Sequence, residues 1–289
     1  MKKRPVIIFD TDMDTDCDDA GALMMLIKAH ISGDISLKGI IADSVCEYAA
    51  PFCKKMLDYY DLNIPVGEIY GRIEVTDRFS DYLKHQRACS GSAYNRALSE
   101  RTEKFEDSTE LYRSLLEESD DGSVTVLCVG MLTAVREVIK RYPLLFKKKV
   151  SRVVIMCNPY KDKDFNLYMD ARSSKEFFNL CPSPIYVSYL GRGIITGEKL
   201  KDALPEDHPV RQAYRIYNGG RGRDSWDLIA SLFAMYPDSP LFSVKESGAI
   251  SYDDVNGISV IDTTIKRDKK IELNCPFDEL KDTLNGMLT

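Results

Sequence analysis

The sequence predicts a single α/β domain with a mostly parallel sheet that is covered by helices on both faces. Short apolar runs typical of buried strands alternate with longer segments in which apolar residues recur at helical spacing. This alternation is typical of βαβ units, whose right-handed crossovers place helices on both faces of a parallel sheet. The chain has 289 residues, 44% of them hydrophobic, and no linker, repeat or low-complexity tract divides it. One domain over residues 1–289 is therefore expected.

Five apolar runs are predicted to form the buried strands of this sheet. Each run is short, bounded by polar or turn residues, and rich in Val, Ile, Leu or Phe, as expected for strands that are covered on both faces. In chain order they are Val6–Phe9, Leu37–Ala42, Val124–Val129, Arg152–Cys157 and Ile185–Tyr189.

Segments with helical spacing lie between and after these strands. The first helix is expected from Asp19 through Ala29, and it ends near Ser32–Gly33, where a glycine favours termination. Further helices are predicted at Ala49–Tyr60, Ser108–Glu118, Leu132–Tyr142 and Leu228–Met235. The Lys147–Lys149 triplet is expected to lie in a solvated turn.

Two regions depart from this alternation. Gly71–Phe105 mixes Arg, Ser, Asp, Tyr and His without a period, so it is either a substrate flap or ordinary surface irregularity. After Ser243 the pattern changes to short β-like pieces that are followed by a helix. These pieces are Ala249–Tyr252, Ile258–Ile261 and Lys270–Leu273, and the helix is Phe277–Leu288. We expect them to form an appended edge of the sheet and not a second domain.

The overall charge argues against two classes of partner. A formal net charge of −6 gives the chain no general affinity for nucleic acid or for an anionic membrane surface. No run of about 18 apolar residues is found, and the apolar stretch after the basic N-terminus is too short for a secretory signal. The eight cysteines are scattered singly, which fits reduced and mostly buried thiols. A cytoplasmic protein that binds neither nucleic acid nor membrane is expected.

The segment Asp10–Asp19 carries the strongest functional signal, because it holds six carboxylates in ten residues. It joins the first predicted strand to the first predicted helix, and ligands of open α/β sheets bind at such loops. No Lys, Arg or His lies between Pro5 and Lys28 to offset charges that repel one another. A hard divalent cation such as Ca²⁺ or Mg²⁺ would offset them, since these ions prefer oxygen ligands. The alternative is a solvated acidic loop whose Asp residues cap the helix.

Four ordered segments carry a family resemblance. They are Ile8–Asp12 with Asp18–Leu23, then Leu111–Leu116 with Asp121–Val126 and Val129–Thr133, then Val154–Met156 with Asp164–Asn166, and finally Ser225–Asp227. They resemble, in turn, the D-x-D and D-D-A motif, the middle strand with its G-x-L-T turn, the M-G-G and E-F-N segment, and the late metal-binding Asp of the nucleoside hydrolases. This family comprises the inosine-uridine-preferring N-ribohydrolases and their relatives. The resemblance implies one nucleoside-hydrolase-like domain with a Rossmann-like sheet.

The resemblance also implies a Ca²⁺-dependent hydrolase of the N-glycosidic bond. It places Ca²⁺ on the side chains of Asp12, Asp19 and Asp227 and on the backbone carbonyl of Val129, with Asp10 in support. Asp12 would take a proton from a calcium-bound water, which then attacks the anomeric carbon of the ribose. Members of the family commonly form dimers or tetramers, so a homodimer or homotetramer is expected.

The substrate implied by the resemblance is a ribonucleoside or a related riboside. Asp18 would accept the ribose 2′-hydroxyl, while Asp164 and Asn166 would hold the other hydroxyls. A pocket of carboxylates suits this chemistry, because an N-glycosidic bond breaks through an oxocarbenium-like transition state. Asn158 is also expected to face the substrate. Trp226 is expected either to stack on the base or to lie in the core.

Several positions depart from the family pattern. Asp14 replaces a Gly and would either become an extra metal ligand or crowd the ribose. The Cys157–Asn158 pair replaces two glycines and would narrow the pocket, and Asp164 is one methylene shorter than the usual Glu. Trp226 stands before Asp227, where many relatives place a His that protonates the departing base.

The sequence contains only three histidines, His30, His85 and His208. His85 and His208 lie in predicted loops, and both are expected to be exposed and without a catalytic role. Tyr160, Tyr168 and Arg223 are further loop residues that the sequence places near the site.

Two other functions fit parts of the sequence. In a haloacid-dehalogenase-type phosphatase, the Asp10-Thr11-Asp12 segment would follow a strand and Asp10 would be the nucleophile, but no convincing set of partner residues follows downstream. In a degenerate relative, the calcium and ribose contacts would persist without turnover, and the departures from the family pattern motivate this reading.

Overall fold

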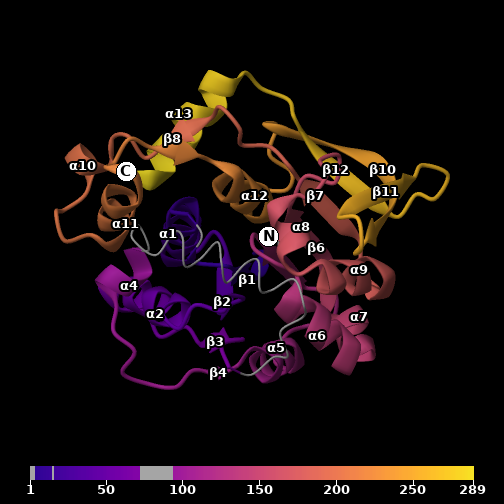
Figure 1. Ribbon diagram of the computed structural model, residues 1–289. Helices are drawn as coiled ribbons and strands as arrows, with labels where there is room; N and C mark the ends of the chain where they lie inside the picture. Colours follow the sequence, from indigo (N-terminus) through magenta and orange to yellow (C-terminus); the bar gives the residue numbers. More distant parts are fainter. Residues whose placement is uncertain (1–3, 15, 72–93) are drawn as a thin grey trace.

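The computed structural model describes residues 4–14, 16–71 and 94–289 (Figure 1). Strand β1 (Val6–Thr11) lies inside the main sheet, parallel to β2 (Ser36–Ala42) on one side and to β5 (Val124–Cys128) on the other. Such a strand contacts helices on both faces, which is why its apolar run shows no alternation with polar residues. The acidic segment begins within this strand, so its carboxylates are held at the carboxyl edge of the sheet.

Ten strands of the described residues form the main sheet, in the order β11-β10-β12-β7-β6-β5-β1-β2-β3-β4. The pairs from β4 to β12 are parallel, whereas β10 pairs with β12 and with β11 in antiparallel fashion. The remaining bounds are β3 (Val66–Glu68), β4 (Glu106–Asp107), β6 (Val150–Met156), β7 (Ile185–Ser188), β10 (Phe242–Asp253), β11 (Ile258–Asp262) and β12 (Asp268–Leu273). A separate antiparallel pair consists of β8 (Ile195–Thr196) and β9 (Arg223–Asp224).

The helices cover both faces of the sheet. Along β1, Ile7 and Phe9 pack into a core with α1, α2 and α12, whereas Ile8 faces a second core with α5, α6 and α9. The bounds are α1 (Asp18–Ile31), α2 (Ala49–Tyr59), α4 (Tyr94–Leu98), α5 (Ser108–Glu117), α6 (Thr133–Arg141), α7 (Pro143–Lys149), α8 (Phe165–Met169), α9 (Ala171–Leu180), α10 (Leu200–Ala203), α11 (Pro209–Asn218), α12 (Trp226–Met235) and α13 (Phe277–Leu288). The predicted fold class, a mostly parallel α/β sheet between two helical layers, is confirmed.

The C-terminal strands extend the sheet, as predicted. Strand β12 pairs in parallel with β7, and β10 and β11 continue from it to the edge (Figure 1). The last helix, α13, then crosses back and packs against α1, with Leu280, Leu284 and Leu288 buried in the first core. Its bounds are the ones that the sequence predicts.

Other expectations are corrected or fall outside the described part. Lys147–Lys149 form the last turn of α7 and not a solvated turn, because Pro143 begins a helix there and Lys149 Nζ donates to the carbonyl of Ser119 at 2.6 Å. Of the irregular stretch Gly71–Phe105, residues 94–98 form α4. Residues 72–93, which contain His85 and most of the candidate flap, lie outside the described residues. Within the described ranges, no helix has the length and apolar character needed to cross a membrane.

Candidate active site

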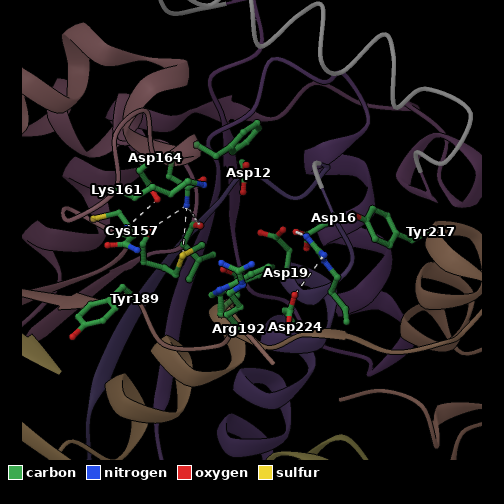
Figure 2. A pocket seen from close by; sticks show the side chains of 18 residues that line it. Asp12, Asp16, Asp19, Cys157, Lys161, Asp164, Tyr189, Arg192, Tyr217 and Asp224 are labelled. Carbon is green, nitrogen blue, oxygen red and sulfur yellow. Dashed lines mark hydrogen bonds and ion pairs between the residues drawn. The ribbon is translucent and has the colours of Figure 1, made fainter. Parts of the chain in front are cut away.

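A cavity of about 730 Å³ opens at the carboxyl edge of the main sheet. Its wall includes Asp12 after β1, Val129 after β5, Cys157 after β6 and Tyr189 after β7, and Asp227 from the first turn of α12 completes it (Figure 2). The loops that follow four neighbouring parallel strands therefore meet in one place. The volume is within the range of small-molecule sites, roughly 300–1,000 Å³.

Three carboxylates of the acidic loop form a tight cluster. Asp16, Asp18 and Asp19 each offer an oxygen, and these atoms lie within 4.8 Å of one another. The backbone N–H of Asp18 donates to Asp16 Oδ1 at 3.1 Å, and Thr11 Oγ1 donates to Asp19. The backbone N–H of Asp227 donates to Asp18 Oδ2 at 3.1 Å, so the start of α12 is joined directly to the start of α1.

The electrostatics of this cluster are those of crowded acids. Burial, followed by the Asp16 carboxylate, raises the pKa of the Asp19 carboxyl to about 8. Burial also raises the pKa of Asp227 well above its usual range, and the neighbouring Asp18, Asp19, Asp16 and Asp12 charges raise it further. Within the described residues, Asp227 Oδ1 is buried without a hydrogen-bond partner. Hard oxygen ligands, excess negative charge and an unpartnered buried acceptor fit a hard divalent cation.

Asp12 is held against the β5 loop by a close backbone approach. Gly130 lies so near that a Cβ atom on it would be 2.5 Å from the Asp12 backbone nitrogen. The preceding carbonyl, that of Val129, accepts from Asn166 Nδ2 at 2.7 Å, and Asn166 also donates to the carbonyl of Met156 at 3.0 Å. The structure therefore brings Asp12, Val129 and Asn166 together, although the sequence assigned them to three separate segments.

Asp10 has a different environment. It is fully buried in β1, does not line the cavity, and its Oδ2 accepts from Tyr112 Oη at 2.5 Å. Burial raises the pKa of the Asp10 carboxyl well above its usual range, and the Asp43 charge raises it further. This placement suits a supporting residue. It argues against the phosphatase hypothesis, which needs an accessible Asp10 nucleophile.

Asp164, Asn158 and Asn166 gather on the wall of the cavity that follows β6. Asp164 Oδ2 accepts from the backbone N–H of Asn158 at 3.1 Å, and Oδ1 is buried without a hydrogen-bond partner in the described part of the chain. Burial raises the pKa of the Asp164 carboxyl to about 6. The Cys157 side chain, at the position where glycine was expected, is buried and also lines the cavity.

Trp226 lines the cavity at the start of α12 and contacts a cation. The Arg223 guanidinium lies 4.8 Å from the Trp226 ring and 5.6 Å from the Tyr217 ring, and its Nη2 pairs with Asp16 Oδ2 at 2.9 Å. Burial opposes ionisation of Asp16, but hydrogen bonds from Asp18 and Arg223 hold the pKa of Asp16 below its ordinary value. Two positions were predicted for Trp226, stacked on the base or in the core, and the structure supports a position facing the cavity.

Asp14 and Asp18, the acidic residues on either side of Asp16, differ from Asp16 because they do not line the cavity. Asp14 is buried, accepts from Asn95 Nδ2 at 3.2 Å, and is not among the residues that line the cavity. Asp18 is also buried and behind the lining, whereas Asp16, to which the sequence assigned no role, faces the cavity.

Neither described histidine reaches the cavity. His208 is buried, not exposed as expected, because it caps α11 by accepting from the Val210 N–H at 3.2 Å and pairs with Tyr60 Oη at 2.9 Å. His30 Nδ1 accepts from the backbone N–H of Leu37. Of the loop candidates, Arg223 lines the cavity, while Tyr160 packs on Tyr189 and Tyr168 on Lys163.

Sequence reasoning missed several lining residues. They include Lys161, Tyr189, Arg192 and Tyr217. The available signal for Lys161, Tyr189 and Arg192 is positional, since Tyr189 ends a predicted parallel strand and the other two follow the end of one. Tyr217 gives no such signal, because it reaches the cavity from α11.

The parallel sheet and the cavity at its edge define the class of protein, an α/β domain with a carboxylate-lined cavity where its strands end. Residues 7–283 match the profile of the family described as inosine-uridine preferring nucleoside hydrolase. The chain belongs to this family of N-glycosyl hydrolases, as its ordered motifs predict.

Solved structures share the fold over almost their full length. A plant nucleoside hydrolase superposes with a TM-score of 0.74 at 16% identity, covering 99% of each chain. The inosine-uridine preferring nucleoside hydrolase of Bacillus anthracis gives 0.69 at 14% identity, covering 98% of this chain and 99% of the other. A purine-preferring ribonucleoside hydrolase from Gardnerella vaginalis gives 0.69 at 15% identity, with the same coverage. A comparison with curated proteins gives no significant match.

Proposed function

We propose that this protein hydrolyses the N-glycosidic bond of a ribonucleoside or a related riboside, with Ca²⁺ as its cofactor. The observation that carries the proposal is the convergence of Asp12, Asp19 and Asp227 on one cavity, although they come from a loop, a helix start and a distant second helix. A solvated acidic loop would not need carboxylates from three separate segments to meet at one cavity. The unpartnered Oδ1 of Asp227 supports the presence of a cation there.

Asp12, Asp19, Asp227 and the Val129 carbonyl would hold the cation, and Asp16, whose carboxylate lies within 4.8 Å of that of Asp19, is close enough to contribute. Bound Ca²⁺ would supply positive charge that orients a water molecule and lowers its pKa. Asp10 supports this arrangement from behind, since Tyr112 fixes its carboxyl within the buried end of β1.

Asp12 is the proposed general base, which accepts a proton from the attacking water as that water adds to the anomeric carbon. The surrounding carboxylates stabilise the positive charge that develops on the ribose ring. Asp164 Oδ1, Asn158 and Asn166, which line the cavity on the β6 side, would bind ribose hydroxyls. Asp18 already accepts the Asp227 N–H through Oδ2, so a contact with the 2′-hydroxyl would have to use Oδ1.

The leaving base would lie against Trp226. Its indole lines the cavity beside Tyr217, and aromatic faces stack on any base. Arg223 cannot act as an ordinary general acid, because its guanidinium stays protonated, but it can donate hydrogen bonds to a departing anionic base.

We further propose that the protein acts in the cytoplasm as a homodimer or homotetramer. The described cysteines are all free, which fits a reducing compartment, and the oligomer is what the family resemblance implies. Light scattering coupled to size exclusion tests the oligomeric state.

Release of free ribose from a panel of nucleosides tests the activity, with added Ca²⁺ and with a chelator. Asp12→Asn should abolish release, while Asp282→Asn, which changes an exposed carboxylate on α13, should leave it unchanged. If no panel member is cleaved although Ca²⁺ binds tightly, the protein is a degenerate relative that retains the site without turnover.

A further inference from the structure

Two cations on the cavity wall have no assigned partner. Lys161 and Arg192 both line the cavity (Figure 2), and within the described ranges neither side chain forms an ion pair. The third lining cation, Arg223, is different because its charge is offset by Asp16 at 2.9 Å. In a protein with a net charge of −6, two positive charges that form no ion pair with the described residues therefore line an acidic cavity.

The backbone of Lys161 is fixed although its side chain is exposed. Its N–H donates to the carbonyl of Asn158 at 3.1 Å, closing a turn directly after β6. The Asn158 side chain also accepts from the Tyr160 N–H at 3.0 Å. The Lys161 charge acts on Asp164, whose carboxyl pKa it lowers against the larger effect of burial. Lys161 and Asp164, which is proposed to bind a ribose hydroxyl, both line the cavity from the loop that follows β6.

Arg192 is anchored in a glycine turn directly after β7. Gly191 has φ +145° and lies so close to Trp226 that a Cβ atom would be 2.5 Å from the indole Cδ1. On the other side, the Gly193 N–H donates to Asp224 Oδ1 at 2.6 Å. The turn is attached to the start of α12, and the guanidinium lines the cavity without an ion pair among the described residues.

The two turns are neighbours. They follow adjacent parallel strands, the Cys157 N–H donates to the Ser188 carbonyl at 3.0 Å, and the Tyr160 and Tyr189 rings are 5.5 Å apart. Lys161 and Arg192 therefore belong to one side of the cavity, the side of β6 and β7. The Asp16, Asp18 and Asp19 cluster lies on the side of β1, two strands farther along the sheet.

We propose that Lys161 and Arg192 form an anion site for a phosphate group on the ribose, so that the substrate is a phosphorylated riboside. This inference rests on the proposed function, because Asp164 must hold the ribose for its substituent to reach Lys161. A compact ammonium and a planar guanidinium together match the several acceptor oxygens of a phosphate. Such a charge-assisted contact contributes about 1.5–3 kcal/mol, which corresponds to roughly 10- to 100-fold in affinity.

The kinetic test compares nucleosides with their 5′-monophosphates and 5′-diphosphates, using ribose release and purified full-length protein. We expect kcat/KM to be highest for a phosphorylated substrate. Lys161→Gln and Arg192→Gln should each lower the ratio of phosphorylated to unphosphorylated kcat/KM by roughly 10-fold or more. Lys201→Gln, which changes an exposed lysine on α10 outside the cavity, should leave the ratio unchanged. The preference should also weaken with added salt.

A binding test separates this inference from the activity. Calorimetry with ribose 5-phosphate and with ribose measures the phosphate contribution without turnover. If no riboside is cleaved but ribose 5-phosphate binds and Arg192→Gln abolishes that binding, the anion site stands and the hydrolase proposal fails. If nucleosides are cleaved as efficiently as their phosphates, and both variants keep the wild-type ratio, the anion site is refuted while the hydrolase proposal stands. Absence of both binding and cleavage refutes both.

Discussion

Gly130 and Asp12 are in such close backbone contact that no side chain fits between them. A Cβ atom at position 130 would lie 2.5 Å from the Asp12 nitrogen and 2.7 Å from its Cβ. The glycine is required by this approach, and it sets the position of the proposed base relative to the Val129 carbonyl. The G-x-L-T turn of the family is thus explained here by contact across two neighbouring strands.

Gly130→Ala is predicted to damage activity far more than stability. The added methyl group must push Asp12 out of place, and a misplacement of about 1 Å can cost around 100-fold in rate. Overpacking of this kind costs about 1–3 kcal/mol of folding free energy. Gly286→Ala is the matched control, because nothing lies within 4 Å of its Cβ position in α13. This substitution should increase the free energy of unfolding by up to ~1 kcal/mol, since alanine favours a helix more than glycine does. Ribose release and denaturant titrations measure the two effects, and wild-type activity in Gly130→Ala would contradict the role given to this contact.

Calcium is predicted to stabilise the protein and Asp19→Asn to remove that response. When no cation is bound, burial and then the neighbouring Asp16 charge disfavour the ionised form of Asp19 and raise its pKa to about 8. Ca²⁺ at about 100 times its Kd should stabilise the fold by ~2.7 kcal/mol. Asp19→Asn should raise the Tm of the metal-free protein and abolish the increase in Tm that Ca²⁺ causes. Asp282→Asn should show the same increase in Tm with Ca²⁺ as the wild type. A Tm that does not change with Ca²⁺ in the wild type would rule out this cation.

The pH dependence of stability is predicted to contain a contribution from Asp164. Burial raises its pKa from 3.8 to about 6 in the folded state. The folded state therefore binds the proton more tightly, so this contribution is fully present below about pH 4 and is lost as the pH rises through 6. Asp164→Asn has no charge to bury, so at pH 8 it should be more stable than the wild type by up to ~3 kcal/mol. The advantage should vanish below pH 4. Urea titrations between pH 4 and 8 measure it, and a constant difference across that range would refute the prediction.

The sequence predicts the longer elements of the fold well and misses its shortest strands. Strand β1 is identified by its continuous apolar run, and helix α13 by apolar residues that recur at helical spacing. Strands β4, β8 and β9 have two residues each, which is too short for a sequence pattern, and they are defined by their pairing with a neighbouring strand. The Lys147–Lys149 triplet was misread for a related reason, since charged residues in a last helical turn resemble a solvated loop.

The same contrast holds for the candidate site. Asp12, Asp19 and Asp227 are recognisable because they occupy strand ends and helix starts with a defined order. A position soon after a predicted strand does not show that the Arg192 side chain faces a cavity, and Tyr217 reaches the cavity from α11, where no local pattern marks it. His208 was expected to be exposed because it precedes a proline, yet the packing of α11 against α2 buries it.

Trp226 is predicted to determine how tightly the leaving base binds. Trp226→Ala removes a stacking surface, and a base stacked on an aromatic ring contributes about 1–3 kcal/mol, so KM should rise roughly 10- to 100-fold. Trp226→Phe should raise KM much less, because an aromatic ring remains on the cavity wall. Arg223→Met should remove both the contact with Trp226 and the pair with Asp16, and kcat should fall if this cation stabilises the departing base. An unchanged KM in Trp226→Ala would place the base elsewhere.

His208 is predicted to act in stability and not in catalysis. Its Nδ1 accepts from the Val210 N–H and its Nε2 pairs with Tyr60, so the ring is neutral in the folded state. Burial lowers the pKa of this imidazole from 6.5 to about 4. The folded state therefore resists protonation, and the contribution of His208 to stability is present above pH 6.5 and lost as the pH falls towards 4.

His208→Asn keeps a capping side chain and should retain ribose release, losing only the Tyr60 contact, about 1 kcal/mol. Its Tm should decline less than that of the wild type between pH 6.5 and 4. Loss of turnover in His208→Asn at full stability would instead identify this histidine as part of the reaction.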